Sequence, residues 1–315
     1  MTKSVTLLIN EIGKFIKSDF HLASYLFTFV IIALCIYFNY TQHFYVNYIR
    51  QSYYTGNSTW VFPLFYTSMY FFIAISTLVL RKDYNALKNK AFYLKSLFII
   101  CIYGISIGFY SYKSIHFPNF FEEENLFIIR IISQLKSLVF YLIPLYILKL
   151  IFDKNIKGLY GLTLNSQHIR GYLILFLALL PFIIIVSFTP DFQLAYPQFK
   201  PWLYTDILGL KTWQTTAIFQ ISYAIDFVMT ELLFRGALVI GMVSILGRNA
   251  ILPMVAMYVA IHFGKPLGET ISSIFGGYIL GALAYQTRHI WGGVIVHISI
   301  ALSMELAAIF QHYTK

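Results

Sequence analysis

The chain has 315 residues, of which 58% are hydrophobic and only 11% are charged, and its net charge is +10. Soluble domains contain roughly 25% charged residues, so this composition predicts an all-α polytopic membrane protein and excludes an ordinary soluble enzyme. The basic residues stand beside apolar stretches instead of forming one basic face. We therefore expect a lipid bilayer, and no nucleic acid, as the partner.

The N-terminal part of the chain alternates between apolar stretches and polar connections. Residues 1–20 place Leu8, Ile12 and Ile16 at helical spacing among polar residues, which predicts an amphipathic helix on the membrane surface. Five further stretches approach the roughly 20 apolar residues that a bilayer crossing needs, at about 22–40, 60–80, 92–112, 127–152 and 171–189. Residues 21–212 are therefore predicted to form N-terminal transmembrane helices.

A basic connection between two of these crossings predicts the orientation of the chain. It contains one acidic residue, Asp83, and the basic residues Arg81, Lys82, Lys88, Lys90 and Lys95. Positively charged connections stay on the cytoplasmic side of a membrane. We expect an integral protein of a bacterial plasma membrane with its N-terminus in the cytoplasm.

Residues 213–315 are predicted to form a four-helix core. Its helices are expected at about 214–245, 250–263, 270–287 and 290–311, which brings the total to eight or nine membrane helices. Gly277 and Gly281 form a small-xxx-small pair, whose usual role is close helix packing.

The ionisable residues inside the apolar helices of this core include one glutamate, one arginine and two histidines that together suggest a site. Each charged group in a membrane helix costs about 2.5–3.5 kcal/mol on insertion scales, so such residues usually face a polar interior and mark a function. Glu231 and Arg235 are four residues apart, so on a helix they share a face and can pair. His262 and His297 come from two further helices. Together they predict a site within the core, although the Glu231–Arg235 pair alone could serve only structure.

At these residues the sequence resembles the CAAX-protease and bacteriocin-processing (CPBP, or Abi) family of intramembrane proteases, which includes the type II CAAX prenyl endopeptidase. The family pattern is EExxxR, then FxxxH, then Hxxx(N/D). Its matches here are Glu231 with Arg235, the run Phe234-Arg235-Gly236, Tyr258 with His262, and His297. The resemblance covers roughly the last 95 residues.

Two positions depart from the family pattern. Thr230 stands at the first Glu, which is usually assigned to activating water, and Ala301 stands at the Asn or Asp that helps to polarise the scissile carbonyl. Ala301 cannot donate a hydrogen bond, and loss of one oxyanion donor typically lowers turnover by about 10²–10³.

The resemblance implies roles for the matched residues. Glu231 would be the base or a metal ligand, His262 its partner, and His297 an oxyanion donor or second nitrogen ligand, while Arg235 would hold Glu231 ionised. If a metal is used, the resemblance implies zinc on Glu231, His262 and His297; a Glu–His scheme without a cofactor is the alternative.

Three acidic residues are secondary candidates to replace the groups that the family pattern has at positions 230 and 301. Asp226 lies one helical turn before Thr230, so its carboxylate could reach the same pocket. Glu269 follows His262 across a glycine-proline break, and Glu305 lies two turns after His297.

The resemblance implies an intramembrane endopeptidase that cleaves a membrane-presented or lipidated peptide. Thr230 and Ala301 favour a first alternative, an inactive relative that acts as a binding, scaffold or bacteriocin self-immunity protein. A proton-coupled transporter is the second alternative, although the sequence shows no internal repeat of the kind found in secondary transporters.

Overall fold

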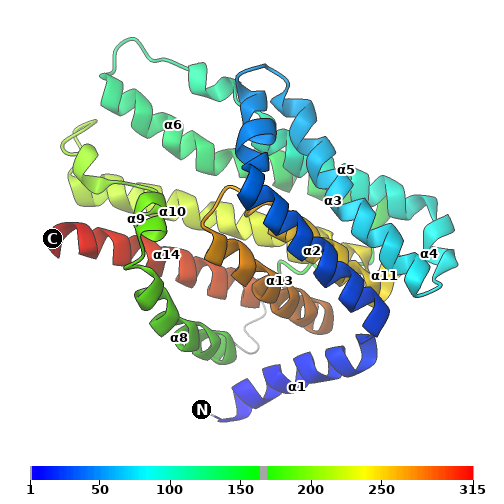
Figure 1. The fold of residues 1–315 in the computed structure, drawn as a ribbon. Helices are drawn as coiled ribbons and strands as arrows, with labels where there is room; N and C mark the ends of the chain where they lie inside the picture. Colours follow the sequence, from blue (N-terminus) through cyan, green and yellow to red (C-terminus); the bar gives the residue numbers. More distant parts are fainter. Residues whose placement is uncertain (1, 164–168, 315) are drawn as a thin grey trace.

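A computed structural model describes residues 2–163 and 169–314 of the chain. The described residues fold into helices joined by turns, without a β-sheet, as Figure 1 shows. Within these described residues, eight helical segments are long and apolar enough to cross a membrane. The prediction of an all-α polytopic membrane protein with eight or nine membrane helices is confirmed.

The N-terminal half follows the predicted order of helices. It contains α1 (Thr2–Asp19), α2 (Leu22–Gln42), α3 (Ser58–Leu80), α4 (Tyr84–Lys88), α5 (Lys90–Gly108), α6 (Glu122–Ser137), α7 (Ile143–Phe152) and α8 (Ile169–Val186). A π-helical turn, Leu138–Leu142, joins α6 to α7, so residues Glu122–Phe152 form one membrane-length segment. The short helix α9 (Pro190–Ala195) begins the connection to the C-terminal core.

The amphipathic helix predicted for residues 1–20 is α1, which lies across one end of the bundle (Figure 1). Leu8 and Phe15 are buried, whereas Leu7, Ile9 and Ile16 remain exposed. The buried side packs against α8 and α13. The exposed apolar side chains suit the interfacial position expected for this helix.

The C-terminal core contains α10 (Thr212–Glu231), α11 (Val243–Leu246), α12 (Ile251–Ala260), α13 (Leu267–Thr287) and α14 (Trp291–Thr314). Helix α12 is its centre, because all 10 of its residues are buried and it packs between α3 and α13. The glycine pair has its predicted role: a Cβ on Gly277 would lie 3.0 Å from Tyr258, and one on Gly281 would lie 2.5 Å from Met254. Both glycines therefore allow α13 to approach α12 closely.

The two halves of the chain share one hydrophobic core, which includes residues of α3, α5 and α12. A buried ion pair of the N-terminal half contacts the C-terminal core at this junction. Lys95 Nζ of α5 lies 2.8 Å from Asp153 Oδ1, just after α7, and also donates to the carbonyl of Gly241 at 2.7 Å. The hydroxyl of Tyr160 donates to the other Asp153 oxygen at 2.8 Å.

Tyr160, which is hydrogen-bonded to Asp153, also packs against the segment between α10 and α11. A Cβ on Gly236 would lie 2.9 Å from the Tyr160 carbonyl oxygen, and one on Gly241 would lie 2.8 Å from the Tyr160 ring. The absence of side chains at these glycines lets Tyr160 pack directly on the backbone of the turn. The position of the turn therefore depends on Lys95 and Asp153 as well as on the core helices.

We predict that Asp153→Ala destabilises the protein by about 3–5 kcal/mol, because the buried Lys95 ammonium loses its counter-charge. The matched double variant Lys95→Met/Asp153→Leu removes both charges, so it should recover most of that loss. Thermal unfolding of the purified protein in detergent measures the difference. If Asp153→Ala melts at the wild-type temperature, the ion pair does not stabilise the protein.

Candidate functional site

The centre of the candidate site is a fully buried ion pair. Glu231 is the last residue of α10, and Arg235 lies in the π-helical turn Leu232–Ala237 that continues it. Arg235 Nη1 lies 2.8 Å from Glu231 Oε1, and both side chains are almost completely buried. Single π-helical turns inside longer helices often occur at functional sites. The pairing predicted from the spacing of these residues is therefore present in the structure.

His297 of α14 completes a direct contact with the pair. Its Nδ1 lies 3.0 Å from Glu231 Oε1. A carboxylate oxygen accepts hydrogen bonds, so Nδ1 donates and Nε2 is the acceptor in the neutral ring. The Glu231 carboxylate thus fixes both the orientation and the tautomer of His297.

Gly293 explains how α14 approaches Glu231 so closely. It lies one turn before His297 on α14, and Glu231 Oε2 occupies the place that a Cβ on Gly293 would take. Any larger residue at position 293 would therefore displace the carboxylate. The sequence interpretation missed this residue, although the Gly292-Gly293 step just before His297 was a visible signal.

Tyr258 of α12 lies between the ion pair and the second histidine. Its hydroxyl is 3.5 Å from His297 Nε2, and the Arg235 guanidinium lies over its ring at 4.2 Å from the centroid. A guanidinium over a tyrosine ring is attracted by the ring electrons. Tyr258 was expected only as a substitute for a family Phe, and its hydroxyl adds a polar group that Phe lacks.

His262 follows α12 and joins the site through Tyr258. Its Nδ1 donates to the Tyr258 carbonyl oxygen at 2.7 Å, and the two rings contact edge to face at 4.8 Å between centroids. The acceptor role of the carbonyl leaves His262 Nε2 without a proton in the neutral ring. The structure therefore places Arg235 and His297 in direct contact with Glu231, and it connects His262 to this group through Tyr258.

Several buried polar atoms of the site have hydrogen-bonding capacity to spare. Glu231 Oε2 and the Arg235 nitrogens have no hydrogen-bond partner among the described residues. The 2.8 Å contact of Nη1 is close enough for an ion pair but lacks hydrogen-bond geometry. Buried polar groups in native proteins are nearly always satisfied. These atoms mark the part of the core best suited to a polar guest such as water or a peptide group.

Asp226 is held away from this constellation. It is half-buried on α10 and lies beside Lys136 and Ser137 at the end of α6. Among the described residues, no hydrogen bond or ion pair joins it to Glu231 or to either histidine. Its expected reach into the pocket is thus not seen in the structure.

Glu269 and Glu305 form hydrogen bonds with the connection between α9 and α10. Glu269 accepts from the hydroxyl of Tyr196 at 3.0 Å, and Lys265 Nζ lies 3.8 Å from its other oxygen. Burial, and then the Glu269 carboxylate, raise the pKa of Tyr196, so this hydroxyl stays a donor. Glu269 thereby ties the connection to the start of α13.

Glu305 is buried on α14 and accepts from the backbone of Gln198 at 2.6 Å and of Phe199 at 3.3 Å. The side chain of Gln220 donates to it at 3.2 Å. Ala301, one turn earlier, packs in an apolar cluster with Phe199 and Tyr223. Glu305 therefore holds the connection between α9 and α10 against α14. Ala301 contributes no polar group to the site.

The donor atoms do not fit a zinc centre as they are arranged. Among residues 2–163 and 169–314 no group of three or more His, Cys, Asp and Glu side chains is placed to hold a metal ion. Glu231 Oε1 is shared by Arg235 and His297, and Tyr258 separates the two histidines. Zinc requires nitrogen ligands at about 2.0–2.1 Å around one point. Zinc binding stays a prediction.

Comparison with known protein families supports the resemblance found in the sequence. Residues 212–303 match the family model described as "Type II CAAX prenyl endopeptidase Rce1-like". The match includes Glu231, Arg235, His262 and His297, and it leaves residues 1–211 outside. No curated protein and no solved structure matches the chain.

We predict that Gly293→Ala destabilises the protein by about 1–3 kcal/mol, because the new methyl group forces the buried Glu231 carboxylate to move. The control is Gly276→Ala on α13, where nothing lies within 4 Å of the added Cβ. It should be neutral or slightly stabilising, since Ala favours a helix over Gly. Unfolding temperatures in detergent compare the two variants, and equal values would mean that α14 does not approach Glu231 as described.

Proposed function

We propose that this chain, whose residues 212–303 form an Rce1-like domain, is an intramembrane endopeptidase that cleaves a membrane-presented or lipidated peptide. The observation that carries the proposal is the direct contact of Glu231 with His297 inside the membrane core. A histidine oriented by a buried carboxylate is the arrangement that general-base catalysis uses on many folds. The family match supports a peptide as the class of substrate.

In the proposed reaction His297 is the base and Glu231 orients it. Access favours this assignment over the one implied by the resemblance, because the His297 side chain is 17% exposed and Glu231 is fully buried. His297 Nε2 takes a proton from water as the water oxygen attacks the peptide carbonyl carbon. The imidazolium then gives this proton to the amine nitrogen when the C–N bond breaks, so a peptide and one water give an acid and an amine. The Glu231 carboxylate stabilises the imidazolium between these steps.

Arg235 compensates the charge of the Glu231 carboxylate through the two steps, because an unpaired charge at this buried position would be costly. The fully buried guanidinium supplies the counter-charge at 2.8 Å. Arg235 also stacks on Tyr258, so it links the carboxylate to the hydroxyl on the far side of His297. We assign it as a positioning residue.

The Tyr258 hydroxyl is our candidate for the oxyanion donor. The family pattern supplies this donor from position 301, where the chain has Ala301 in an apolar cluster. The hydroxyl lies 3.5 Å from the proposed base, which is within reach of a carbonyl group that the base-bound water attacks. His262 positions Tyr258 through the hydrogen bond to its carbonyl.

Thr230 and Ala301 keep a second candidate function open. A protein that binds a peptide in the same core without cleaving it, such as a scaffold or a bacteriocin self-immunity protein, needs neither an activating Glu nor an oxyanion donor. The residues Glu231 and His297 would then hold the helices together. No observation on the described residues favours a proton-coupled transporter over these two functions.

We predict that Glu231→Gln lowers peptide cleavage by about 10⁴-fold, because the neutral amide no longer fixes the His297 tautomer or stabilises its charge. Tyr258→Phe, which restores the family residue, should lower turnover by about 10²–10³ while leaving the fold intact. The assay uses purified protein in lipid nanodiscs with a library of membrane-inserted peptides, and mass spectrometry detects the products.

Unfolding temperatures and metal content serve as controls for these variants. Cleavage by the wild type that persists in Glu231→Gln would contradict the proposed base pair. Cleavage by no form of the protein, with peptide binding unchanged in both variants, would favour the silent binder. Stoichiometric zinc that is lost in His262→Ala and in His297→Ala would replace the metal-free scheme by a zinc-dependent one.

A further inference from the structure

A second polar site lies at the end of the bundle where α1 meets α2. It is a cavity of about 670 Å³, open to the surface and lined by Arg81, Lys82, Asp83, residues 243–249 and Tyr285. This volume is within the range of about 300–1,000 Å³ that small-molecule sites usually have. None of the residues that contact Glu231 lines it, so it is separate from the candidate active site.

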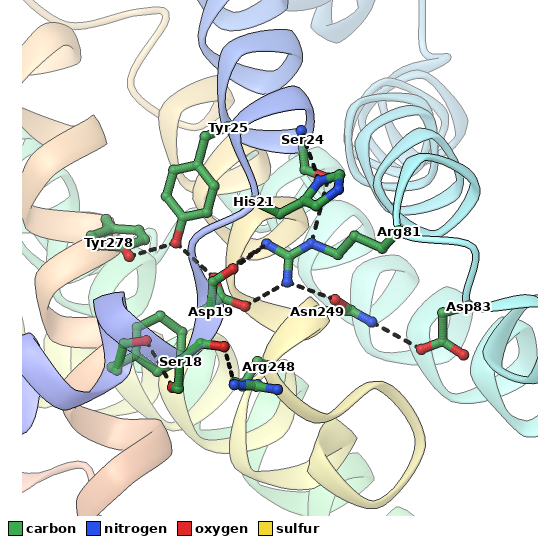
Figure 2. Close-up of polar contacts among 11 residues, drawn as sticks. Ser18, Asp19, His21, Ser24, Tyr25, Arg81, Asp83, Arg248, Asn249 and Tyr278 are labelled. Atoms are coloured by element: carbon green, nitrogen blue, oxygen red, sulfur yellow. Dashed lines mark hydrogen bonds and ion pairs between the residues drawn. The ribbon is translucent and has the colours of Figure 1, made fainter.

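The wall of the cavity is an ordered network of hydrogen bonds, which Figure 2 shows. Arg81 Nη1 lies 2.6 Å from Asp19 Oδ1 and 3.1 Å from Asn249 Oδ1. Asn249 in turn donates to Asp83 Oδ2 at 2.9 Å. Elements that are distant in the sequence, namely the end of α1, the end of α3 and the turn before α12, are thus fixed around one opening.

The cations of this site exceed its carboxylates. Asp19 offsets Arg81, and Asp83 is the one acidic residue in the lining. Among the described residues neither Lys82 nor Arg248 forms an ion pair with a carboxylate; Arg248 donates to the backbone carbonyl of Ser18 instead. Both side chains are exposed to solvent. The cavity therefore offers two available cations to an anion that enters it.

Exposed apolar side chains lie on the two helices, α2 and α3, that have an end near this polar cavity. Leu80, at the end of α3, precedes the lining residue Arg81 and is 36% exposed, and on α2 Leu22 and Leu26 are 66% and 57% exposed. Both helices are membrane-length segments, and Arg81, just after α3, donates to the Ser24 hydroxyl in the first turn of α2 at 3.4 Å. Because the ends of membrane-crossing helices lie near the lipid headgroups, we expect this cavity at the depth of the headgroups.

We propose that this cavity binds the phosphate-bearing headgroup of an anionic membrane phospholipid, with the acyl chains along α2 and α3. Lys82 and Arg248 would contact the phosphate, and Asn249 and Ser244 would hydrogen-bond the polar part of the headgroup. The basic connection after α3 is predicted to be cytoplasmic, and the cytoplasmic leaflet carries the anionic lipids. A bound lipid would join α1, α3 and α11 at one point and hold the amphipathic helix in place.

Native mass spectrometry of the full-length protein in detergent tests the site with phosphatidylglycerol as the probe. Lys82→Gln/Arg248→Gln should bind this lipid more weakly, by about fivefold for each substitution. The matched control, Lys88→Gln/Lys90→Gln, makes the same change in charge on exposed residues outside the cavity. It should bind like the wild type. Ser244→Glu, which adds a negative charge at an exposed position of the lining, should weaken binding without removing any cation.

Phosphatidylcholine and inorganic phosphate separate the possible ligands. Retention of phosphatidylglycerol by wild type and control, together with its loss from Lys82→Gln/Arg248→Gln and Ser244→Glu, would support the proposal. Equal losses in the control would overturn it in favour of a diffuse charge effect. Equal binding of phosphatidylcholine, or full displacement of the lipid by millimolar inorganic phosphate, would overturn the assignment to an anionic lipid.

Discussion

The buried Glu231–Arg235 pair is the constraint on which the C-terminal core depends. Two charges in a membrane interior are tolerated only when each compensates the other, and removal of one partner leaves an uncompensated charge. The 2.8 Å contact satisfies this condition across a π-helical turn. His297 then adds a third ionisable group to the same carboxylate oxygen. A core built only to hold helices together would gain little from such an arrangement, since apolar residues of similar volume would pack as well.

The rest of the fold keeps this group in place. Gly293 lets α14 come close enough for His297 to reach the carboxylate. Gly277 leaves room for Tyr258 between α12 and α13. From the N-terminal half, Tyr160 packs on the turn that contains Arg235 and is itself held by Asp153. The N-terminal helices, which lie outside the family match, therefore contribute to the geometry of the site.

The sequence predicts the helices and the main pair well, because both follow from local spacing. The Glu231–Arg235 contact needs only the four-residue repeat of a helix, and the membrane segments need only their length and apolar composition. The grouping of His297 with Glu231 was predicted from the family resemblance, because the local sequence does not determine that α14 packs against α10. The domain boundary at residue 212, the cytoplasmic N-terminus and zinc binding stay predictions.

Contacts between distant segments could not be predicted in the same way. Asp226 shares a helix with Glu231, yet the rotation of α10 turns it toward Lys136. Glu305 reads as a possible catalytic acid, but the backbone of Gln198 and Phe199 folds onto it. The role of the Tyr258 hydroxyl depends on the packing of α10, α12 and α14 against one another. The periodicity of the sequence does not predict where these helices make contact.

A double-mutant cycle on the unfolding free energy tests the contact between Glu231 and His297 most directly. The cycle compares Glu231→Gln, His297→Ala and the double variant in the same detergent. Residues in one hydrogen-bonded network couple by about 0.5–3 kcal/mol, and we predict a coupling energy in the upper half of that range. A coupling energy within about 0.3–0.5 kcal/mol of zero, the value found for independent sites, would contradict the account.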